Sequence, residues 1–519
     1  MQNDSYWSKK VSRVLFGYSL VVGSVTTAFA GVPTQTQIST FIQSLSAAGP
    51  TACPAAYTQN PDVPTVMYSG QDRLRSSQLI ANVASSDILS DQKTKTGPFQ
   101  GFPLPNGQTL GTYTPPNQGV DLYRVNYLST DLKGQPTELS GLVVFPQGGM
   151  DGGLIVYDHA TQISQTGGAP SFPSGEACIV ITAMGGKGRV IAMPDYLGFG
   201  ISSDAHPYPL GIQNAPASID LITATRELAA ALYPGKPIGS PLYITGYSEG
   251  GGNALMLGRL LEQKKLPNLK PSLLAPMSGN YDMTGAMAQS LIVTQPGQQA
   301  TTLVSKPLLA LFAAQGAWDV TGSDPNSLVQ PSFASYGLAN SLPLPWNGQA
   351  EQAAYITGLM ITSYNLGYLK GGASNPSVLL QPQLVSAIQT RDLSNPVIAL
   401  WAQNDDTVWN PETPIYATGI LQDQIVPFAG SSYPPPPNYT GGNAFFAQGN
   451  TENLILSMRS RGYKSSAVSW CGLDAENFIN SSGKKAMLNH LNGLVPVSIL
   501  AARAIEQGTL TGLPVLPDP

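Results

Sequence analysis

The sequence has few charged residues, and no long run of one sign. Of its 519 residues, 11% are Asp, Glu, Lys or Arg, and the formal net charge is -5. Lys and Arg never occur in runs longer than two. Nucleic acids and anionic membrane surfaces attract clustered positive charge, so the sequence argues against both as partners. The 42% of apolar residues predicts instead a globular protein with a sizeable core.

Cysteine is also scarce, with Cys53, Cys178 and Cys471 as the three examples. Three cysteines allow one disulfide in an oxidising compartment, and the sequence alone leaves all three pairings open. None of them has the close Cys or His spacing of a metal site or a redox motif. We therefore expect neither a metal nor a cofactor.

The N-terminus has the pattern of an export signal. Lys9, Lys10 and Arg13 precede an apolar stretch over residues 14–29, which ends in Ala-Phe-Ala at 28–30. The stretch is short for a membrane span and is interrupted by Gly, Ser and Thr. We expect a signal peptide over residues 1–30, cleavage near Ala30, a secreted or periplasmic protein, and no stable membrane insertion.

The remaining chain alternates between strand and helix patterns. Residues 121–127 and 139–145 predict a two-stranded hairpin. Short apolar runs that suit buried parallel strands follow at 154–157, 190–193, 242–245, 272–277 and 397–401. Helical spacing occupies residues 217–233 and 253–265. This alternation predicts an α/β fold with a mostly parallel, doubly wound sheet.

Two segments interrupt the strand rhythm. Residues 31–118 are rich in Gln, Ser, Thr, Pro and Gly, and we interpret them as an N-terminal extension packed on the core. Residues 284–391 are rich in Ala, Gln, Leu and Tyr, and we interpret them as a mainly helical cap, or lid. The core is then divided into a first part over 119–283 and a second over 392–519.

The motif that carries chemistry is Gly-Tyr-Ser-Glu-Gly at residues 246–250. It stands between a predicted strand and a predicted helix, where its glycines permit the sharp turn that exposes a nucleophilic serine. A serine hydroxyl also needs a base, an acid that orients the base, and amide donors for the oxyanion. We predict Ser248 as the nucleophile.

The partners of Ser248 are predicted from the chain order that accompanies this turn, which is nucleophile, acid, base. Among the three histidines, only His490 lies after the last predicted strand. The loop after residues 397–401 contains Asp405 and Asp406, and we predict Asp406 as the acid with Asp405 as the alternative.

The oxyanion donors are predicted as two main-chain amides. One belongs to Glu249, the residue after the nucleophile, and the other to Thr161 in the loop after residues 154–157, with Ala160 as the alternative. His159 in that loop is expected to brace it and to take no part in the chemistry.

Taken together, the motifs resemble the secretory lipases and related exported esterases of the α/β-hydrolase superfamily, over roughly residues 121–507. The resemblance rests on Asp-His-Ala-Thr at 158–161, Pro-Asp-Tyr-Leu-Gly-Phe-Gly at 194–200, His-Pro-Tyr at 206–208, Gly-Tyr-Ser-Glu-Gly-Gly at 246–251, the Asp405-Asp406 loop and His490. It implies an α/β-hydrolase fold, a Ser/Asp/His triad, a helical lid inserted before the acid, and structural roles for Asp195 and His206.

The predicted function is hydrolysis of carboxylic esters through an acyl-enzyme. A peptidase that uses the same triad is one alternative, because a Ser/His/Asp triad also cleaves amides. A non-catalytic binding protein that retains the fold is another, because fold does not determine function. The sequence does not identify the acyl chain or the oligomeric state.

Overall fold

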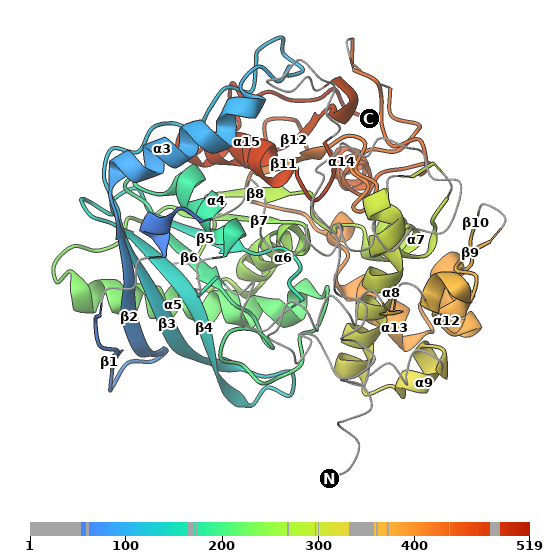
Figure 1. Ribbon diagram of the computed structural model, residues 1–519, viewed down its shortest axis with the longest axis horizontal. Coiled ribbons are helices and arrows are strands. Elements are labelled where there is room, and N and C mark those ends of the chain that lie inside the picture. Colours follow the sequence, from blue (N-terminus) through green and yellow to red (C-terminus); the bar gives the residue numbers. More distant parts are fainter. Residues whose placement is uncertain are drawn as a thin grey trace, which may run out of the picture.

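A ten-stranded β-sheet runs through the protein, whose structure here is a computed structural model (Figure 1). The strand order is β1-β2-β3-β4-β6-β5-β7-β8-β11-β12. Along this order, the neighbours from β1 to β4 and the pair of β4 with β6 are antiparallel. The remaining neighbours, β6-β5-β7-β8-β11-β12, are parallel. The bounds are β1 Val66–Met67, β2 Leu74–Val83, β3 Val120–Thr130, β4 Pro136–Pro146, β5 Leu154–Asp158, β6 Val190–Pro194, β7 Leu242–Tyr247, β8 Leu273–Met277, β11 Ile415–Ile420 and β12 Val468–Leu473.

The structure describes most of the chain from residue 53 onward. The described residues are 53–58, 62–163, 170–171, 174–266, 269–295, 297–298, 300–331, 358–359, 362–370, 373–434, 436–437, 439–477 and 488–519. The predicted signal peptide at 1–30 lies outside them, as does the middle of the predicted cap. Among the helices that are described, none is both long and apolar enough to cross a membrane.

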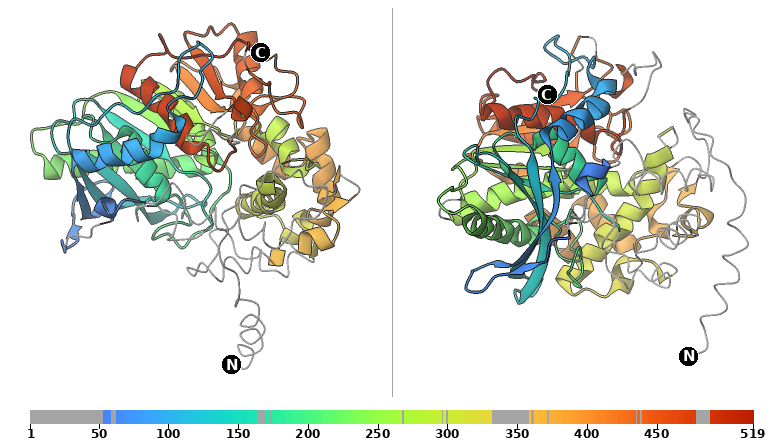
Figure 2. Two further views of the ribbon diagram at one scale, coloured as in Figure 1. Left: turned by 45° about the horizontal axis from the view of Figure 1, so that its top comes forward. Right: turned by 60° about the vertical axis from the view of Figure 1, so that its left-hand side comes forward.

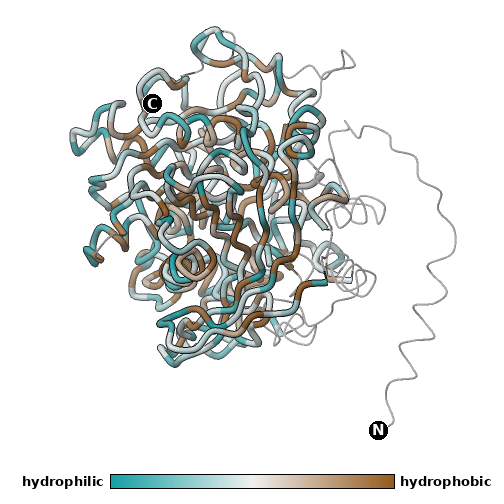
Figure 3. The backbone as a smooth tube through the Cα atoms, turned by 90° about the vertical axis from the view of Figure 1, so that its left-hand side faces the viewer, coloured by the Kyte–Doolittle hydropathy of each residue, from teal (hydrophilic) through white to brown (hydrophobic). Residues whose placement is uncertain are grey.

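Helices cover both faces of the sheet, as the two further views show (Figure 2). On one face, α3, α4 and α15 share an apolar cluster with the strands, and on the other, α5, α6 and α14 do so. Hydrophobic residues accordingly follow the central strands through the interior (Figure 3). The bounds are α3 Ser85–Thr96, α4 Gly175–Met184, α5 Gly211–Leu232, α6 Glu249–Lys264, α14 Asn450–Ser460 and α15 Leu494–Gln507.

The predicted strand pattern is confirmed through residue 277. The hairpin forms as β3 and β4, and the four apolar runs that follow form β5, β6, β7 and β8. Successive side chains of β4 point to opposite faces of the sheet. Leu142 and Val144 therefore pack in the apolar cluster on one face, and Val143 and Phe145 pack in the cluster on the other. The two predicted helices correspond to α5 and α6, each of which begins earlier and ends one residue before the predicted end.

The fifth predicted strand, residues 397–401, is wrong, because these residues belong to helix α13, Pro396–Gln403. Asn395 caps this helix by accepting hydrogen bonds from the amides of Val397 and Ile398, at 3.0 and 3.4 Å. Pro396 occupies the first helical position, where its fixed φ suits a helix and its missing N–H is no loss. The next strand of the sheet is β11, which begins at Ile415.

A third apolar cluster joins α13 to helices of the predicted cap, which lie together beside the sheet in Figure 1. These helices are α7 Ala288–Ile292, α8 Ala300–Thr321, α9 Pro325–Leu328 and α12 Pro382–Thr390. Two short strands, β9 Leu369–Lys370 and β10 Ala373–Ser374, pair with each other. The cluster also contains Ile425 and Val426, which belong to the loop after β11. The cap helices therefore pack directly on that loop.

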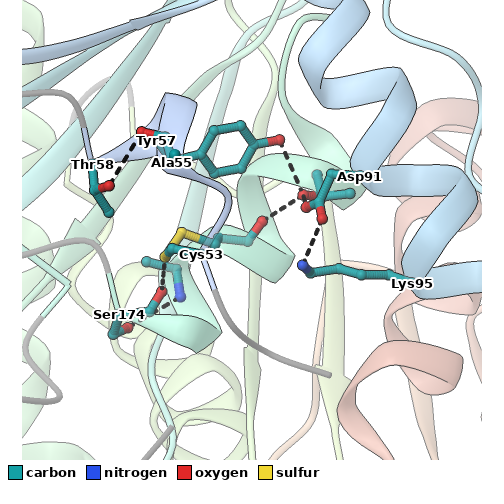
Figure 4. The surroundings of a disulfide bond; sticks show 10 residues. Cys53, Ala55, Tyr57, Thr58, Asp91, Lys95 and Ser174 are labelled. Carbon is teal, nitrogen blue, oxygen red and sulfur yellow. Dashed lines mark hydrogen bonds and ion pairs between the residues drawn. A yellow bond between two sulfur atoms is a disulfide. The ribbon is translucent and has the colours of Figure 1, made fainter. Parts of the chain in front are cut away.

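Residues of the predicted N-terminal extension supply β1, β2 and α3. Cys471 is a buried free thiol, whereas a disulfide between Cys53 and Cys178 ties this segment to α4 (Figure 4). Beside it, the Lys95 ammonium pairs with the Asp91 carboxylate at 2.7 Å. Of the three pairings that the sequence allowed, the structure contains this one.

Candidate active site

Ser248 lies at the turn between β7 and α6, as the sequence predicted. Its backbone has φ 58° and ψ -121°, a positive-φ conformation that side chains other than Gly adopt at a cost. The turn is also crowded: a Cβ at Gly246 would collide with the carbonyl of Gly250, and one at Gly250 with the carbonyl of Asp158. Only glycines at these two positions let the strand turn so sharply into the helix.

The side chains of Ser248, His490 and Asp423 form a hydrogen-bonded chain. The distance from His490 Nε2 to Ser248 Oγ is 2.7 Å, and that from His490 Nδ1 to Asp423 Oδ2 is 2.6 Å. An ionised carboxylate only accepts, so Nδ1 carries the proton and Nε2 is left to accept from the serine hydroxyl. The sequence predicted two of these three residues.

Asp423 stands three residues after β11, in the loop on which the cap helices pack. Its carboxylate is buried, with 1% of the residue exposed. Its Oδ1 accepts hydrogen bonds from the amides of Ile425 and Val426, both at 2.9 Å. Asn443 donates to its main-chain oxygen at 2.6 Å. Two amides on one oxygen and the imidazole on the other leave this carboxylate a single orientation.

His490 is held from a second side by Tyr247, the residue before Ser248. The two rings stack with their centroids 5.2 Å apart, and the tyrosine hydroxyl donates to the His490 carbonyl at 2.5 Å. His490 itself is 5% exposed and precedes α15. His490 is thereby held by Asp423 and by the strand that carries Ser248.

The prediction of Asp406 as the partner of His490 is wrong. Asp406 is buried beside Arg259, with 3.8 Å between its Oδ1 and Arg259 Nη1. Burial raises the pKa of this carboxyl well above its ordinary value, an effect that Arg259 opposes. The alternative, Asp405, accepts from the amide and hydroxyl of Thr284, at 2.9 and 2.5 Å. Neither carboxyl contacts His490.

The error follows from the mistaken strand at residues 397–401. Because that run is helix α13, the next strand of the sheet is β11, and the carboxylate that bonds His490 follows β11. The sequence did carry a usable signal: Asn-Pro at 395–396 is typical of a helix start, and Ile-Tyr-Ala-Thr-Gly-Ile at 415–420 is followed by Leu-Gln-Asp.

The two predicted oxyanion donors lie in the expected segments. Glu249 is the first residue of α6, and Thr161 lies in the loop after β5. Within the described residues, neither main-chain amide donates to a protein acceptor. The amide of Ala160, the alternative, donates to Glu176 Oε1 at 2.9 Å and is committed there. This contrast favours Thr161 over Ala160.

Buried polar side chains connect this loop to the segment after β6, and connect that segment to the turn at Ser248. His206 Nε2 lies 2.7 Å from Glu249 Oε1, and its Nδ1 lies 3.1 Å from the carbonyl of Leu197. His159 stacks on Tyr196, with 4.1 Å between ring centroids. His159 contacts main-chain oxygens, and His206 contacts a loop carbonyl and the Glu249 side chain of α6; in the described part of the chain neither ring forms a hydrogen bond with Ser248 or His490.

Three further buried carboxyls lie around the loop. Burial raises the pKa of Asp158 to about 7, although hydrogen bonds from Ser218 and Tyr196 oppose the change. Burial also raises the pKa values of Glu176 and Asp195. Asp195 accepts from Ser140 Oγ at 2.5 Å and is buried. Across the described residues, no three His, Cys, Asp or Glu side chains are grouped to hold a metal ion.

Comparison with known proteins identifies the fold. No protein-family model and no curated protein sequence matches the chain. Among solved structures, the rice cell wall degrading esterase LipA from Xanthomonas oryzae aligns with a TM-score of 0.60 and 18% identity, over 80% of this chain and 94% of that one. A candidate hydrolase from Legionella pneumophila aligns with a TM-score of 0.59 and 21% identity, over 84% and 98%. The chain has the α/β-hydrolase fold.

Proposed function

We propose that this protein is a serine hydrolase that cleaves carboxylic esters through an acyl-enzyme. The observation that carries the proposal is the hydrogen-bonded chain from Ser248 through His490 to Asp423. The fold supports it, and the esterase name of the Xanthomonas structure makes esters the first substrates to test. We also propose a secreted or periplasmic location, on the signal-peptide pattern at residues 1–30.

The first half of the reaction forms the acyl-enzyme. His490 Nε2 takes the hydroxyl proton as Ser248 Oγ attacks the ester carbonyl, and Asp423 stabilises the imidazolium. The main-chain amides of Glu249 and Thr161 donate to the oxyanion of the tetrahedral intermediate. When this intermediate collapses, the bond to the alcohol breaks and His490 returns its proton to the departing oxygen.

The second half regenerates the serine. Water donates a proton to His490 as its oxygen attacks the acyl carbonyl, and a second tetrahedral intermediate forms. Its collapse breaks the bond to Ser248 Oγ, which recovers the proton from His490, and releases the carboxylic acid. Each proton that moves in the cycle is therefore carried by His490.

The test is hydrolysis of p-nitrophenyl esters of graded acyl length by the mature protein and by Ser248→Ala. Loss of the nucleophile lowers kcat by about 10⁶-fold in a triad hydrolase. A wild-type protein without ester hydrolysis, or a Ser248→Ala variant of equal activity, contradicts the proposal. Parallel assays with aminoacyl anilides test the peptidase alternative, and labelling of Ser248 by a fluorophosphonate distinguishes either enzyme from a binding protein.

A further inference from the structure

A lysine of the cap lies fully buried against the loop that holds Asp423. Lys306, on helix α8, has 0% of its surface exposed. Its Nζ donates to the main-chain carbonyl of Ile425 at 2.8 Å and lies 5.7 Å from the centre of the Phe446 ring. Among the described residues it has no other hydrogen-bond acceptor.

This arrangement carries an electrostatic cost. Burial lowers the pKa of Lys306 to about 7, and the carboxylate of Asp423 opposes that decrease. Asp423 is the charged side chain whose field acts on the ammonium. A buried ammonium with one carbonyl partner destabilises the folded protein relative to an apolar residue of the same shape. Because Lys306 lies beside the loop that carries Asp423, a role in the active site would explain a lysine that burial disfavours.

A single peptide unit connects Lys306 to Asp423. The carbonyl of Ile425, which accepts from Lys306, belongs to the same amide as the N–H of Val426. That N–H donates to Asp423 Oδ1 at 2.9 Å. A cation on the oxygen of an amide polarises it and makes its N–H a stronger donor, because hydrogen bonds in a chain reinforce one another. The ammonium therefore acts on the carboxylate through one peptide.

We propose that Lys306 is a positioning residue of the active site, which holds the Ile425–Val426 peptide in place and stabilises Asp423 in its ionised form. The inference rests on the proposed function. It makes helix α8 part of the catalytic machinery, because the cap supplies the charge that orients the triad acid. A purely structural lysine would affect folding stability without acting on the reaction through Asp423.

A double-mutant cycle separates these two roles. Lys306→Met keeps an unbranched side chain, one atom shorter, but removes its charge and its donor. In the wild-type background, at a pH below about 7 where Lys306 is charged, we expect kcat for a p-nitrophenyl ester to fall about tenfold, which is the value of one hydrogen bond to a charged group. In the Asp423→Asn background we expect a further change below about twofold, because the group through which Lys306 acts is already lost. Equal losses in both backgrounds overturn the proposal.

The pH profile supplies an independent readout. Lys306 is a cation only below about pH 7, and there its charge favours the ionised form of Asp423, which the triad needs. Its removal is expected to move the acid limb of kcat/KM to higher pH. Lys306→Gln, which restores a neutral donor to Ile425, should recover part of kcat but leave the limb displaced. It also serves if the Met variant does not fold. An unchanged limb in both variants contradicts the proposal.

Lys95→Met is the matched control. Lys95 is also buried and pairs with Asp91 on α3, beside the disulfide (Figure 4). Its loss should lower the melting temperature and leave the pH profile unchanged. If the wild-type protein shows no hydrolysis that depends on Ser248, the proposed function fails and this inference with it. If that hydrolysis is present and Lys306→Met matches wild type, the inference alone fails.

Discussion

Replacement of Asp423 by Asn tests the assignment of the acid, and the structure specifies how the variant fails. The two oxygens of Asp423 face different partners, because Oδ1 accepts from the Ile425 and Val426 amides and Oδ2 from His490. In the Asp423→Asn variant the side-chain carbonyl oxygen must face the two amide donors, since an NH₂ group there would meet two N–H groups. The NH₂ group is left facing His490 Nδ1.

That orientation inverts the tautomer of the base. Nδ1 must then accept, the ring proton moves to Nε2, and Nε2 can no longer take the proton of Ser248. We expect Asp423→Asn to lower kcat by about 10⁴-fold, the loss found when a triad acid is replaced in this way. KM should change little, because the carboxylate contacts the base and lies behind it, away from the serine.

Asp406→Asn is the control for this assay of ester hydrolysis. Asp406 is as deeply buried as Asp423 but contacts Arg259. We expect its variant to keep kcat within about threefold of wild type, because it acts on no triad member. The reasoning would be refuted by an Asp423→Asn variant within about tenfold of wild type, or by an Asp406→Asn variant that loses as much as Asp423→Asn is expected to lose.

Three further predictions concern groups around the site. Asp158 retains its proton up to about pH 7 in the folded protein but ionises near 3.8 when exposed. The free energy of unfolding should therefore fall as pH rises between these values, by at most about 4 kcal/mol. In urea unfolding, Asp158→Asn should flatten this pH dependence. Removal of the Cys53–Cys178 disulfide, which spans 125 residues, should lower stability by up to about 5 kcal/mol, seen as a lower melting temperature in the Ser double variant, whereas an unchanged temperature contradicts this. Glu176→Ala removes the carboxylate that anchors the Ala160 amide, so the neighbouring Thr161 donor loses its fixed position. We expect kcat to fall by about tenfold or more with little change in KM in steady-state kinetics, and an unchanged kcat contradicts this.

Local signals were sufficient for much of the fold and for two members of the site. Residues 242–252 combine a buried strand, a crowded glycine turn and a helix, and each of these is encoded within a few neighbouring positions. His490 was found because only three histidines exist and one lies late in the chain. In both cases the prediction needed no information about tertiary packing.

The acid required information of another kind. The run at 397–401 is apolar enough for a buried strand, and it is buried, but against the cap helices and not within the sheet. The prediction that this run is buried was therefore correct, and the prediction that it is a strand was wrong. The partner of His490 depends on which strand comes next to β8 in the sheet, and that is a tertiary property. The disulfide pairing was open for the same reason.

The turn at Ser248 also determines which mutations this protein tolerates. The glycines at 246, 250 and 251 are fixed by the main chain, because a Cβ on any of them would strike a carbonyl oxygen. They should stay invariant in any library selected for folding alone. Position 248 behaves in the opposite way, because its positive φ favours glycine over serine by about 1 kcal/mol. Drift without selection for chemistry would therefore favour Ser248→Gly, the one replacement that relieves the positive φ.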